Sequence, residues 1–221
     1  WSSEIFGNAL LQAPESQVET ACRNEFSKMR VEVMAGQYLD VREAGEKTYS
    51  AERSLRIARF KSAKYTIERP LHIGAVIGKP EKSDHAALLD ALSRYGLPLG
   101  EAFQLRDDML GIFGDPSVTG KPAGDDLREG KRTVLMAMTL ERADQATAAK
   151  ITSALGREDL TSDQIEELRA LITATGAVKD VEDLIEGLLS NALTAANSGE
   201  IDPSARELLI ELATSATRRS H

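Results

Sequence analysis

The chain has 221 residues, and its 27 lysines and arginines against 35 aspartates and glutamates give a formal net charge of −8. The composition excludes a disordered or collagen-like chain, and the acidic balance argues against nucleic-acid binding, which depends on clustered basic side chains. Cys22 has no second cysteine to pair with. No apolar stretch approaches the roughly 18 residues of a membrane span. We expect one all-helical domain over residues 1–221.

Helical spacing dominates the chain from Val18 onward, because apolar residues recur three and four positions apart. No segment alternates as a strand would, so the predicted fold class is all-α, with roughly eight or nine helices. The first predicted helix begins near Pro14 or Ser16 and ends near Gly45. Two further helices are predicted over 50–63 and from Pro70 onward, and a long one over 83–110 with a kink at Gly96–Pro98. After the next helix, which begins at Thr133, the predicted helices cover 144–155, 161–174, 176–196 and 201–218.

The helical pattern stops between Gly111 and Gly130, where glycines and prolines are dense. We predict an irregular loop of about 20 residues, and loops of that length inside a compact domain are often functional. The loop and its end carry four cations among the glycines, namely Lys121, Arg128, Lys131 and Arg132. Glycine lets the backbone come close to a ligand, so this loop suits an anion.

Two carboxylates precede the loop on a predicted helix, and Gln104 lies beside them at helical spacing. Asp107 and Asp108 have no His or Cys nearby in the sequence, so they offer a hard, oxygen-only site of the kind that Mg²⁺ prefers. Carboxylates followed by lysines are suited to a metal-bridged polyphosphate. Taken alone, an Asp-Asp pair is usually a solvated surface feature and Gly-Lys-Pro a turn, so the order and spacing of the set carry the prediction.

The combined pattern resembles the second aspartate-rich region of the trans-prenyltransferases, the polyprenyl diphosphate synthases, and is most similar to bacterial geranylgeranyl-type enzymes. The residues that carry the resemblance are Phe103-Gln104-x-x-Asp107-Asp108 and Gly120-Lys121-Pro-x-Gly-Asp-Asp126-Leu-Arg-Glu-Gly-Lys131-x-Thr. The resemblance implies an all-α bundle around a central apolar cavity. It also implies that isopentenyl diphosphate is condensed with an allylic diphosphate, such as farnesyl diphosphate, with Mg²⁺ as the cofactor.

Two further stretches are similar to the same family. Gly36-Gln37-Tyr-Leu-Asp40 matches its Gly-Gln-x-x-Asp helix, and Lys61-Ser62-Ala-Lys-Tyr matches its Lys-Thr-Ala stretch with Ser in place of Thr. The resemblance implies that Asp107 and Asp108 bind metal and that Lys61, Lys121 and Lys131 neutralise the diphosphate. It also implies a substrate-binding set of Gln37, Asp40, Lys61, Ser62, Phe103, Gln104, Lys121 and Lys131.

The chain departs from the family pattern in two places. The second region of many members reads Asp-Asp-x-x-Asp, and its last position here is Gly111. Asp115, Asp125 or Asp126 are candidates to compensate for the missing carboxylate. The family's first aspartate-rich motif is absent from the 221 residues. We therefore expect this chain to be the C-terminal part of a longer synthase that lacks its N-terminal helices.

Two functions of different classes remain open at this point. The first is a Mg²⁺-dependent prenyltransferase that makes a longer isoprenyl diphosphate, such as geranylgeranyl diphosphate, although this chain alone could be inactive. The second is a non-catalytic helical subunit or partner of a heteromeric synthase, which the missing first motif favours. A terpene cyclase fits less well, because the Lys121 to Lys131 loop resembles synthases. From the resemblance we expect a homodimer in the cytoplasm.

Overall fold

The computed structural model describes residues 2–10, 16–46, 48–78, 85–120 and 124–218, and every regular element within them is a helix. The predicted all-α class is therefore confirmed for the described part of the chain. The elements are α1 (Ser2–Leu10), α2 (Ser16–Ala44), α3 (Ala51–Ala58), the π-helix η1 (Arg59–Glu68), α4 (Arg69–Gly78), α5 (Ala86–Phe113), α6 (Pro116–Thr119), α7 (Asp125–Glu129), α8 (Val134–Arg142), α9 (Gln145–Ala154), α10 (Ser162–Ala174), α11 (Ala177–Ala196) and α12 (Pro203–Thr217).

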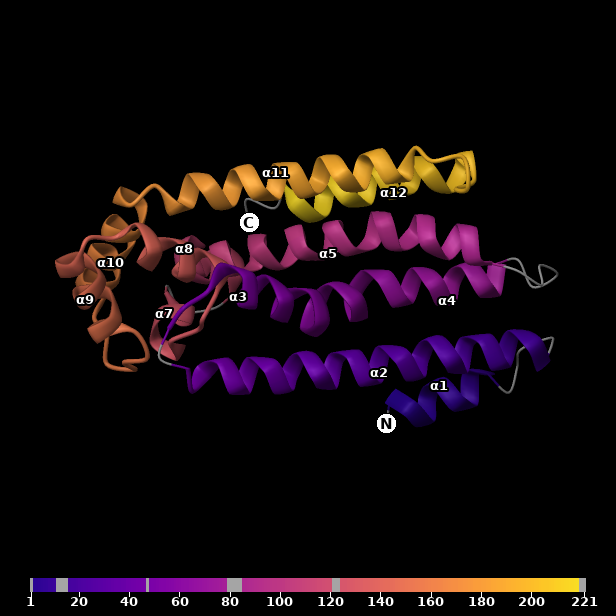
Figure 1. Cartoon of the computed structure of the whole chain (residues 1–221), viewed down its shortest axis with the longest axis horizontal. Helices are drawn as coiled ribbons and strands as arrows, with labels where there is room; N and C mark the ends of the chain where they lie inside the picture. Colours follow the sequence, from indigo (N-terminus) through magenta and orange to yellow (C-terminus); the bar gives the residue numbers. More distant parts are fainter. Residues whose placement is uncertain (1, 11–15, 47, 79–84, 121–123, 219–221) are drawn as a thin grey trace.

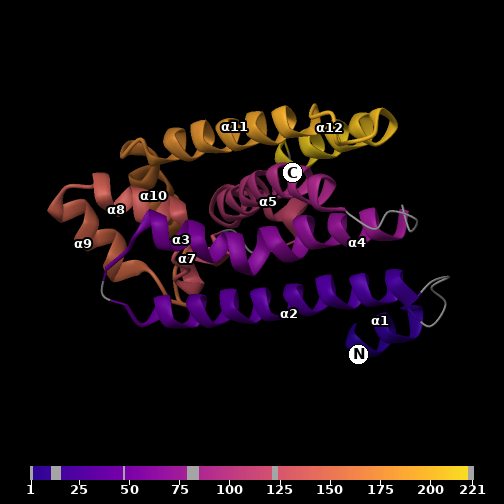
Figure 2. The same cartoon turned by 45° about the vertical axis from the view of Figure 1, so that its right-hand side comes forward.

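The long helices lie along the longest axis of the molecule (Figure 1). In both views α2 forms one edge, α11 and α12 form the other, and the α3–η1–α4 helix and α5 lie between them (Figures 1 and 2). The shorter helices α7 to α10 gather at the end where α3 begins. No helix in the described ranges is long and apolar enough to cross a bilayer.

The predicted break before Pro70 is wrong, because α3, η1 and α4 follow one another without interruption from Ala51 to Gly78. Proline is disfavoured inside a helix because it lacks an N–H and its ring crowds the carbonyl four residues back. Here the backbone N–H of Arg69 donates to the carbonyl of Lys64, five residues back. This wider turn directly before Pro70 relieves the crowding, and the helix continues.

The region from Gly111 to Gly130 is less irregular than the sequence predicts. The helix α5 passes through Pro98 in one piece and ends only at Phe113, and the short helices α6 and α7 follow. The Asp115 side chain caps α6 by accepting the backbone N–H of Ser117 at 2.8 Å. The prediction of one irregular loop of about 20 residues is therefore wrong, because α6, capped by Asp115, and α7 form within it.

Two apolar clusters hold α5 in place. One lies towards the α7–α10 end and includes Leu105, Ile112 and Val181; the other lies between α5, α11 and α12 and includes Leu99. The phenol of Tyr95 is fully buried and donates to the backbone carbonyl of Leu209 at 2.7 Å, so it joins α5 to α12. Because α5 is packed on several sides, the residues on its last turns have fixed positions.

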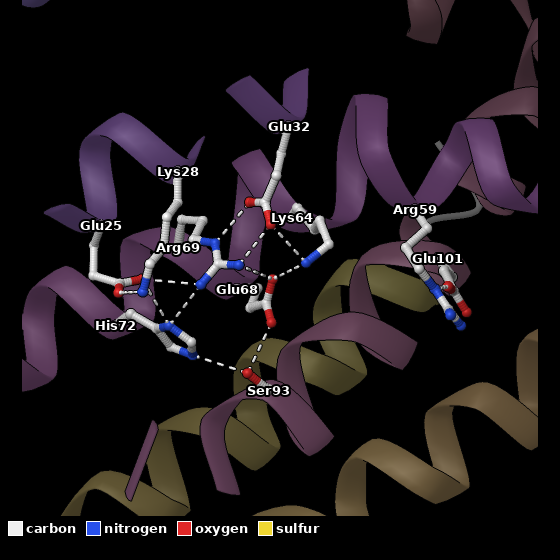
Figure 3. Close-up of polar contacts among 10 residues, drawn as sticks. All are labelled: Glu25, Lys28, Glu32, Arg59, Lys64, Glu68, Arg69, His72, Ser93 and Glu101. Atoms are coloured by element: carbon white, nitrogen blue, oxygen red, sulfur yellow. Dashed lines mark hydrogen bonds and ion pairs between the residues drawn. The ribbon is translucent and has the colours of Figure 1, made fainter. Parts of the chain in front are cut away.

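A buried network of charged side chains ties α2 to η1, α4 and α5 (Figure 3). At its centre the Arg69 guanidinium donates to both carboxylate oxygens of Glu32, at 2.6 and 2.7 Å, and to Glu25 at 2.9 Å. His72 lies 3.1 Å from Glu25 and 3.0 Å from the Ser93 hydroxyl. His72 is therefore a buried structural residue.

The network lowers the pKa values of Glu25 and Glu32. Burial by itself would raise the pKa of Glu32, but hydrogen bonds from Arg69 and Lys64 outweigh burial and lower it. The pKa of Glu25 is lowered in the same way, with hydrogen bonds from Lys28 and His72 outweighing burial. In turn, the hydrogen bond to Glu32 raises the pKa of Arg69. Glu25, Glu32 and Arg69 are thus charged and paired at neutral pH.

We predict that Arg69→Met lowers the free energy of unfolding at pH 7 by about 3–5 kcal/mol, because it removes the guanidinium that Glu25 and Glu32 share and leaves only Lys28 and Lys64 as their cationic partners. The lowered pKa values stabilise the folded state above the ordinary glutamate value of 4.5, and this stabilisation is lost as the pH falls through the lower folded values. The difference in the free energy of unfolding between Arg69→Met and the unsubstituted protein should therefore be smaller in acid. Urea unfolding at pH 7 and pH 4 measures both effects.

The matched control is Arg56→Met, because Arg56 forms an exposed ion pair with Glu52. Exposed pairs contribute roughly 0–1 kcal/mol. An equal loss of unfolding free energy in Arg69→Met and Arg56→Met would contradict the stabilising role of the buried network.

Candidate functional site

A pocket of about 270 Å³ opens at the end of the bundle where α2, the α3–η1 helix and α5 meet the segment before α8. Polar and charged side chains from four separate parts of the sequence converge on it. The lining residues are Asp40, Ser54, Ile57, Ala58, Lys61, Ser62, Gln104, Asp107, Asp108, Lys131, Arg132, Thr133 and Val134.

One wall of the pocket brings a lysine from η1 against a carboxylate from α2. The ammonium of Lys61 lies 2.5 Å from Asp40 Oδ2, and each side chain is 41% exposed. Ser62 follows Lys61 and also lines the pocket. The two charged residues of this pair lie 21 positions apart in the sequence, and the contact between α2 and η1 brings them together.

Another wall of the pocket carries the two aspartates of α5. Asp107 is exposed, whereas Asp108 is half-buried and accepts a hydrogen bond from Gln104 Nε2 at 2.8 Å. Removal from water, together with the charges of Asp126 and Asp107, raises the pKa of Asp108 to about 7 against the hydrogen bond from Gln104. The carboxylates thus repel each other, and a cation between them would relieve that repulsion.

The third wall holds Lys131, which pairs with two acids of α7. Its ammonium contacts the buried carboxylate of Asp126 and lies 3.2 Å from Glu129. Burial would lower the pKa of Lys131, but these two acids outweigh burial and raise it. Burial raises the pKa of Asp126 in spite of the pairing. Lys131 is therefore a firmly charged cation at the pocket.

The missing carboxylate at Gly111 has a structural counterpart. A Cβ at Gly111 would overlap the carboxylate of Asp126, with Asp126 Oδ1 only 2.9 Å away. Of the three candidates named from the sequence, Asp126 thus fills the space beside position 111, while Asp115 caps α6. Gly111 leaves room for the acid that pairs with Lys131.

The structure places the other predicted site residues differently. Gln37 is exposed on α2 outside the pocket lining, and Phe103 packs against the apolar cluster that includes Leu99. Lys121 lies outside the described residues. Roles for these three in binding substrate stay predictions.

Two of the loop cations point to other parts of the chain. Arg128 donates to the carbonyl of Leu160 at 3.1 Å. Arg132 stacks 4.3 Å from the Tyr49 ring centroid and donates to the carbonyl of Glu46 at 2.6 Å, although it also lines the pocket.

Sequence reasoning missed Ser54, whose hydroxyl donates to the carbonyl of Arg132 at 2.9 Å. This bond anchors the segment that carries Lys131 to α3. A signal was present, because Ser54, Ala58 and Lys61 recur at the spacing of one helix face. The pattern was not recognisable as a site without the segment that lies opposite it.

The donor set fits a divalent cation that is shared with phosphate. Among the described residues, no three His, Cys, Asp or Glu side chains converge as a protein-only metal cage. Asp107 and Asp108 offer carboxylate oxygens, and Lys61 and Lys131 are within the same pocket. Mg²⁺ typically takes one or two carboxylates, several waters and substrate phosphates. The arrangement can therefore hold a metal with a polyphosphate, and it does not suit a metal alone.

The sequence profile of the polyprenyl synthetase family matches residues 6–172. The chain belongs to this family. The resemblance found in the motifs around Asp107 is thereby confirmed at the level of the family.

Relatives of known name agree with this membership. A geranylgeranyl diphosphate synthase of Mycobacterium tuberculosis is 32% identical over 146 residues, which is 66% of this chain and 40% of the relative. A short chain isoprenyl diphosphate synthase of Methanocaldococcus jannaschii is 33% identical over 142 residues, 64% of this chain and 41% of the relative. The chain thus spans less than half the length of these relatives.

Solved structures share the fold. Geranylgeranyl pyrophosphate synthase from Corynebacterium glutamicum, complexed with isoprenyl diphosphate and magnesium, has a TM-score of 0.87 and 41% identity over 93% of this chain and 57% of that chain. Polyprenyl synthase from Caulobacter crescentus, complexed with calcium and isoprenyl diphosphate, has a TM-score of 0.77 and 30% identity over 90% of this chain and 59% of that chain. The fold is that of the polyprenyl synthases.

We predict that Gly111→Ala lowers the free energy of unfolding by about 1–3 kcal/mol, because the new methyl group displaces the Asp126 carboxylate. The same substitution in an Asp126→Ala background should cost little. Gly187→Ala is the control, since a Cβ there meets nothing within 4 Å. Calorimetric unfolding of the four variants measures these differences, and an equal effect of Gly111→Ala in both backgrounds would contradict the overlap.

Proposed function

We propose that this chain forms part of a prenyltransferase that condenses isopentenyl diphosphate with an allylic diphosphate. The observation that carries the proposal is that Lys61, Lys131, Asp107 and Asp108 line one pocket. Such a mixture of cations and hard oxygen ligands suits a diphosphate bridged to a metal. Its relatives are named as isoprenyl diphosphate synthases, which supports the same chemistry.

In this proposal the allylic diphosphate lies between the lysines and the aspartates. Its carbon–oxygen bond breaks to give an allylic cation and pyrophosphate. The double bond of isopentenyl diphosphate attacks that cation, and the proton that is then lost passes to the pyrophosphate. Lys61 and Lys131 would stabilise the charge that develops on the departing diphosphate, and fixed charges aimed at a developing charge are an effective catalytic device. Mg²⁺, when bound, would supply further positive charge to the same oxygens.

Asp107 and Asp108 are the proposed metal-binding residues, with the exposed Asp107 the more accessible of the two. The synthase from Corynebacterium glutamicum is complexed with isoprenyl diphosphate and magnesium, and that from Caulobacter crescentus with calcium, which supports a divalent cation. A geranylgeranyl product is supported by the names of the Mycobacterium and Corynebacterium relatives. A cytoplasmic location belongs to the same proposal.

A condensation assay tests the function. The chain is incubated with isopentenyl diphosphate, farnesyl diphosphate and Mg²⁺, and extracted lipid product is measured. We expect product that falls by at least about 100-fold in Asp107→Ala, because metal binding is lost. Asp163→Ala is the matched control, since Asp163 is exposed in the first turn of α10.

No product above the Asp107→Ala background would favour the alternative function, in which this chain is a non-catalytic subunit or partner. Product that is insensitive to both substitutions would exclude the pocket as the active site.

We also propose a homodimer that forms through α2. Four large apolar side chains of this helix lie on its open side, each about two-thirds exposed, and their spacing of three and four residues makes one stripe: Val31, Met34, Tyr38 and Val41. The helix forms one edge of the layered bundle (Figure 2). A continuous apolar stripe on an exposed helix is typical of an interface.

We predict that the double substitution Val31→Glu and Met34→Glu converts a dimer into a monomer, because two charges would be buried in the apolar contact. Size-exclusion chromatography with light scattering measures the mass. The control is Leu208→Glu on α12, where the leucine is 68% exposed, as are Val31 and Met34. A monomer before substitution, or a dimer that survives it, would contradict this interface.

A further inference from the structure

Two neighbouring residues of η1, Lys61 and Ser62, both line the pocket. Consecutive side chains of an α-helix diverge by about 100°, as those of Asp107 and Asp108 do across the same pocket. The segment from Arg59 to Glu68 is a π-helix, whose wider turns rotate the chain less per residue. The smaller rotation brings the side chains of Lys61 and Ser62 closer together at the pocket than neighbours on an α-helix would be.

Glycines on both flanking helices make room for the wide turn. A Cβ at Gly36 of α2 would lie 2.6 Å from the Cα of Lys61, and one at Gly100 of α5 would lie 2.6 Å from the Cβ of Ala63. Real Cβ atoms essentially never come closer than 3.0 Å to such neighbours, so no other residue fits at either position without a shift of the backbone. The π-helix is thus in close backbone contact with α2 at Lys61 and with α5 at Ala63.

Ion pairs hold the same segment near both ends (Figure 3). Near its start, Arg59 pairs with the buried Glu101 of α5. Towards its end, Lys64 lies 3.0 Å from Glu32 of α2 and 3.1 Å from Glu68. Glu101 and Glu32 belong to α5 and α2, the same two helices that supply the glycines, whereas Glu68 belongs to η1 itself. The wide turn, which lies directly before Pro70, is therefore also held by its surroundings.

We propose that Gly36 and Gly100 are positioning residues for diphosphate binding, because they hold the η1 π-helix in the register that aims Lys61 and Ser62 into the pocket. The inference rests on the proposed function for the identity of the ligand, and it rests on the contacts above for the position of Lys61. The proposal gives Gly36 of the Gly36-Gln37-x-x-Asp40 motif a role separate from that of Asp40, which lies on the same helix and pairs with Lys61.

The test uses inorganic pyrophosphate with Mg²⁺ as the probe and isothermal titration as the readout. We expect Gly36→Ala to weaken binding roughly tenfold, because a displaced Lys61 loses a hydrogen bond to a charged group. Gly187→Ala is the matched control, as its added methyl meets nothing within 4 Å and it lies on α11. Circular dichroism and thermal unfolding of each variant show whether it is folded.

A double-mutant cycle separates positioning from general damage. If Gly36 acts through Lys61, the Gly36→Ala, Lys61→Ala double variant binds no more weakly than Lys61→Ala alone. Additive losses would overturn the inference. Should Gly36→Ala lose its helical content, Gly100→Ala and Glu101→Gln repeat the cycle from the α5 side.

A second readout does not depend on the ligand. Limited acetylation followed by mass spectrometry compares the reactivity of Lys61, which is paired with Asp40, with that of Lys179, a reference lysine on α11. We expect Lys61 to react severalfold faster in Gly36→Ala and at an unchanged rate in Gly187→Ala.

The two readouts distinguish the two kinds of failure. Absence of pyrophosphate binding by the unsubstituted chain, with Lys61 reactivity still altered in Gly36→Ala, would overturn the proposed function and leave the placement of Lys61 supported. Unchanged reactivity and unchanged affinity in a folded Gly36→Ala would overturn the inference itself.

Discussion

The close approach of three backbones, α2, η1 and α5, is the constraint on which the rest of the molecule depends. Helices with ordinary side chains at their contact pack 8–10 Å apart. Here Gly36, Gly96 and Gly100 stand where the π-helix comes nearest, and a Cβ at Gly96 would already lie 3.1 Å from the Cα of Glu68. Because η1 is held between its neighbours, one wall of the pocket has little freedom, and Lys61 is placed by backbone contacts as well as by its pair with Asp40.

The same close packing has an electrostatic consequence. Glu25 and Arg69 are buried between α2 and α4, and Glu32 is only 17% exposed. Charges in such a place must be paired, since an uncompensated buried charge costs several kcal/mol. Replacing the whole network by apolar residues could be as stable, so stability alone does not explain it. What it adds is specificity: the forked guanidinium of Arg69 meets both Glu32 oxygens in only one register of α2 against α4.

Most helices could be predicted from the sequence, whereas the π-helix η1 could not. Apolar spacing locates α2, α5, α10 and α11 because each buries one face, and that periodicity survives in the sequence. The π-helix was not predicted, because Pro70 indicates only a break and the close contacts that hold the wide turn come from two other helices, at Gly36 and Gly100. For the site, motif order placed Asp40, Lys61, Ser62, Gln104, Asp107, Asp108 and Lys131 at one pocket, all of which line it. Spacing in the sequence could not show that the Asp126 carboxylate lies beside Gly111, since this contact depends on how α7 packs against α5.

The pairing of each site lysine with a resident acid bears on how a diphosphate would enter. Lys61 is held by Asp40, and Lys131 by Asp126 and Glu129, so neither cation is free to attract an anion at long range. Asp107 and Asp108 add further negative charge at the same opening. A pyrophosphate that carries divalent cations would bring positive charge that Asp107 and Asp108 can accept. In the proposed function, metal and diphosphate should consequently bind together, and the lysines would exchange their carboxylate partners for phosphate oxygens only after the metal has neutralised the aspartates.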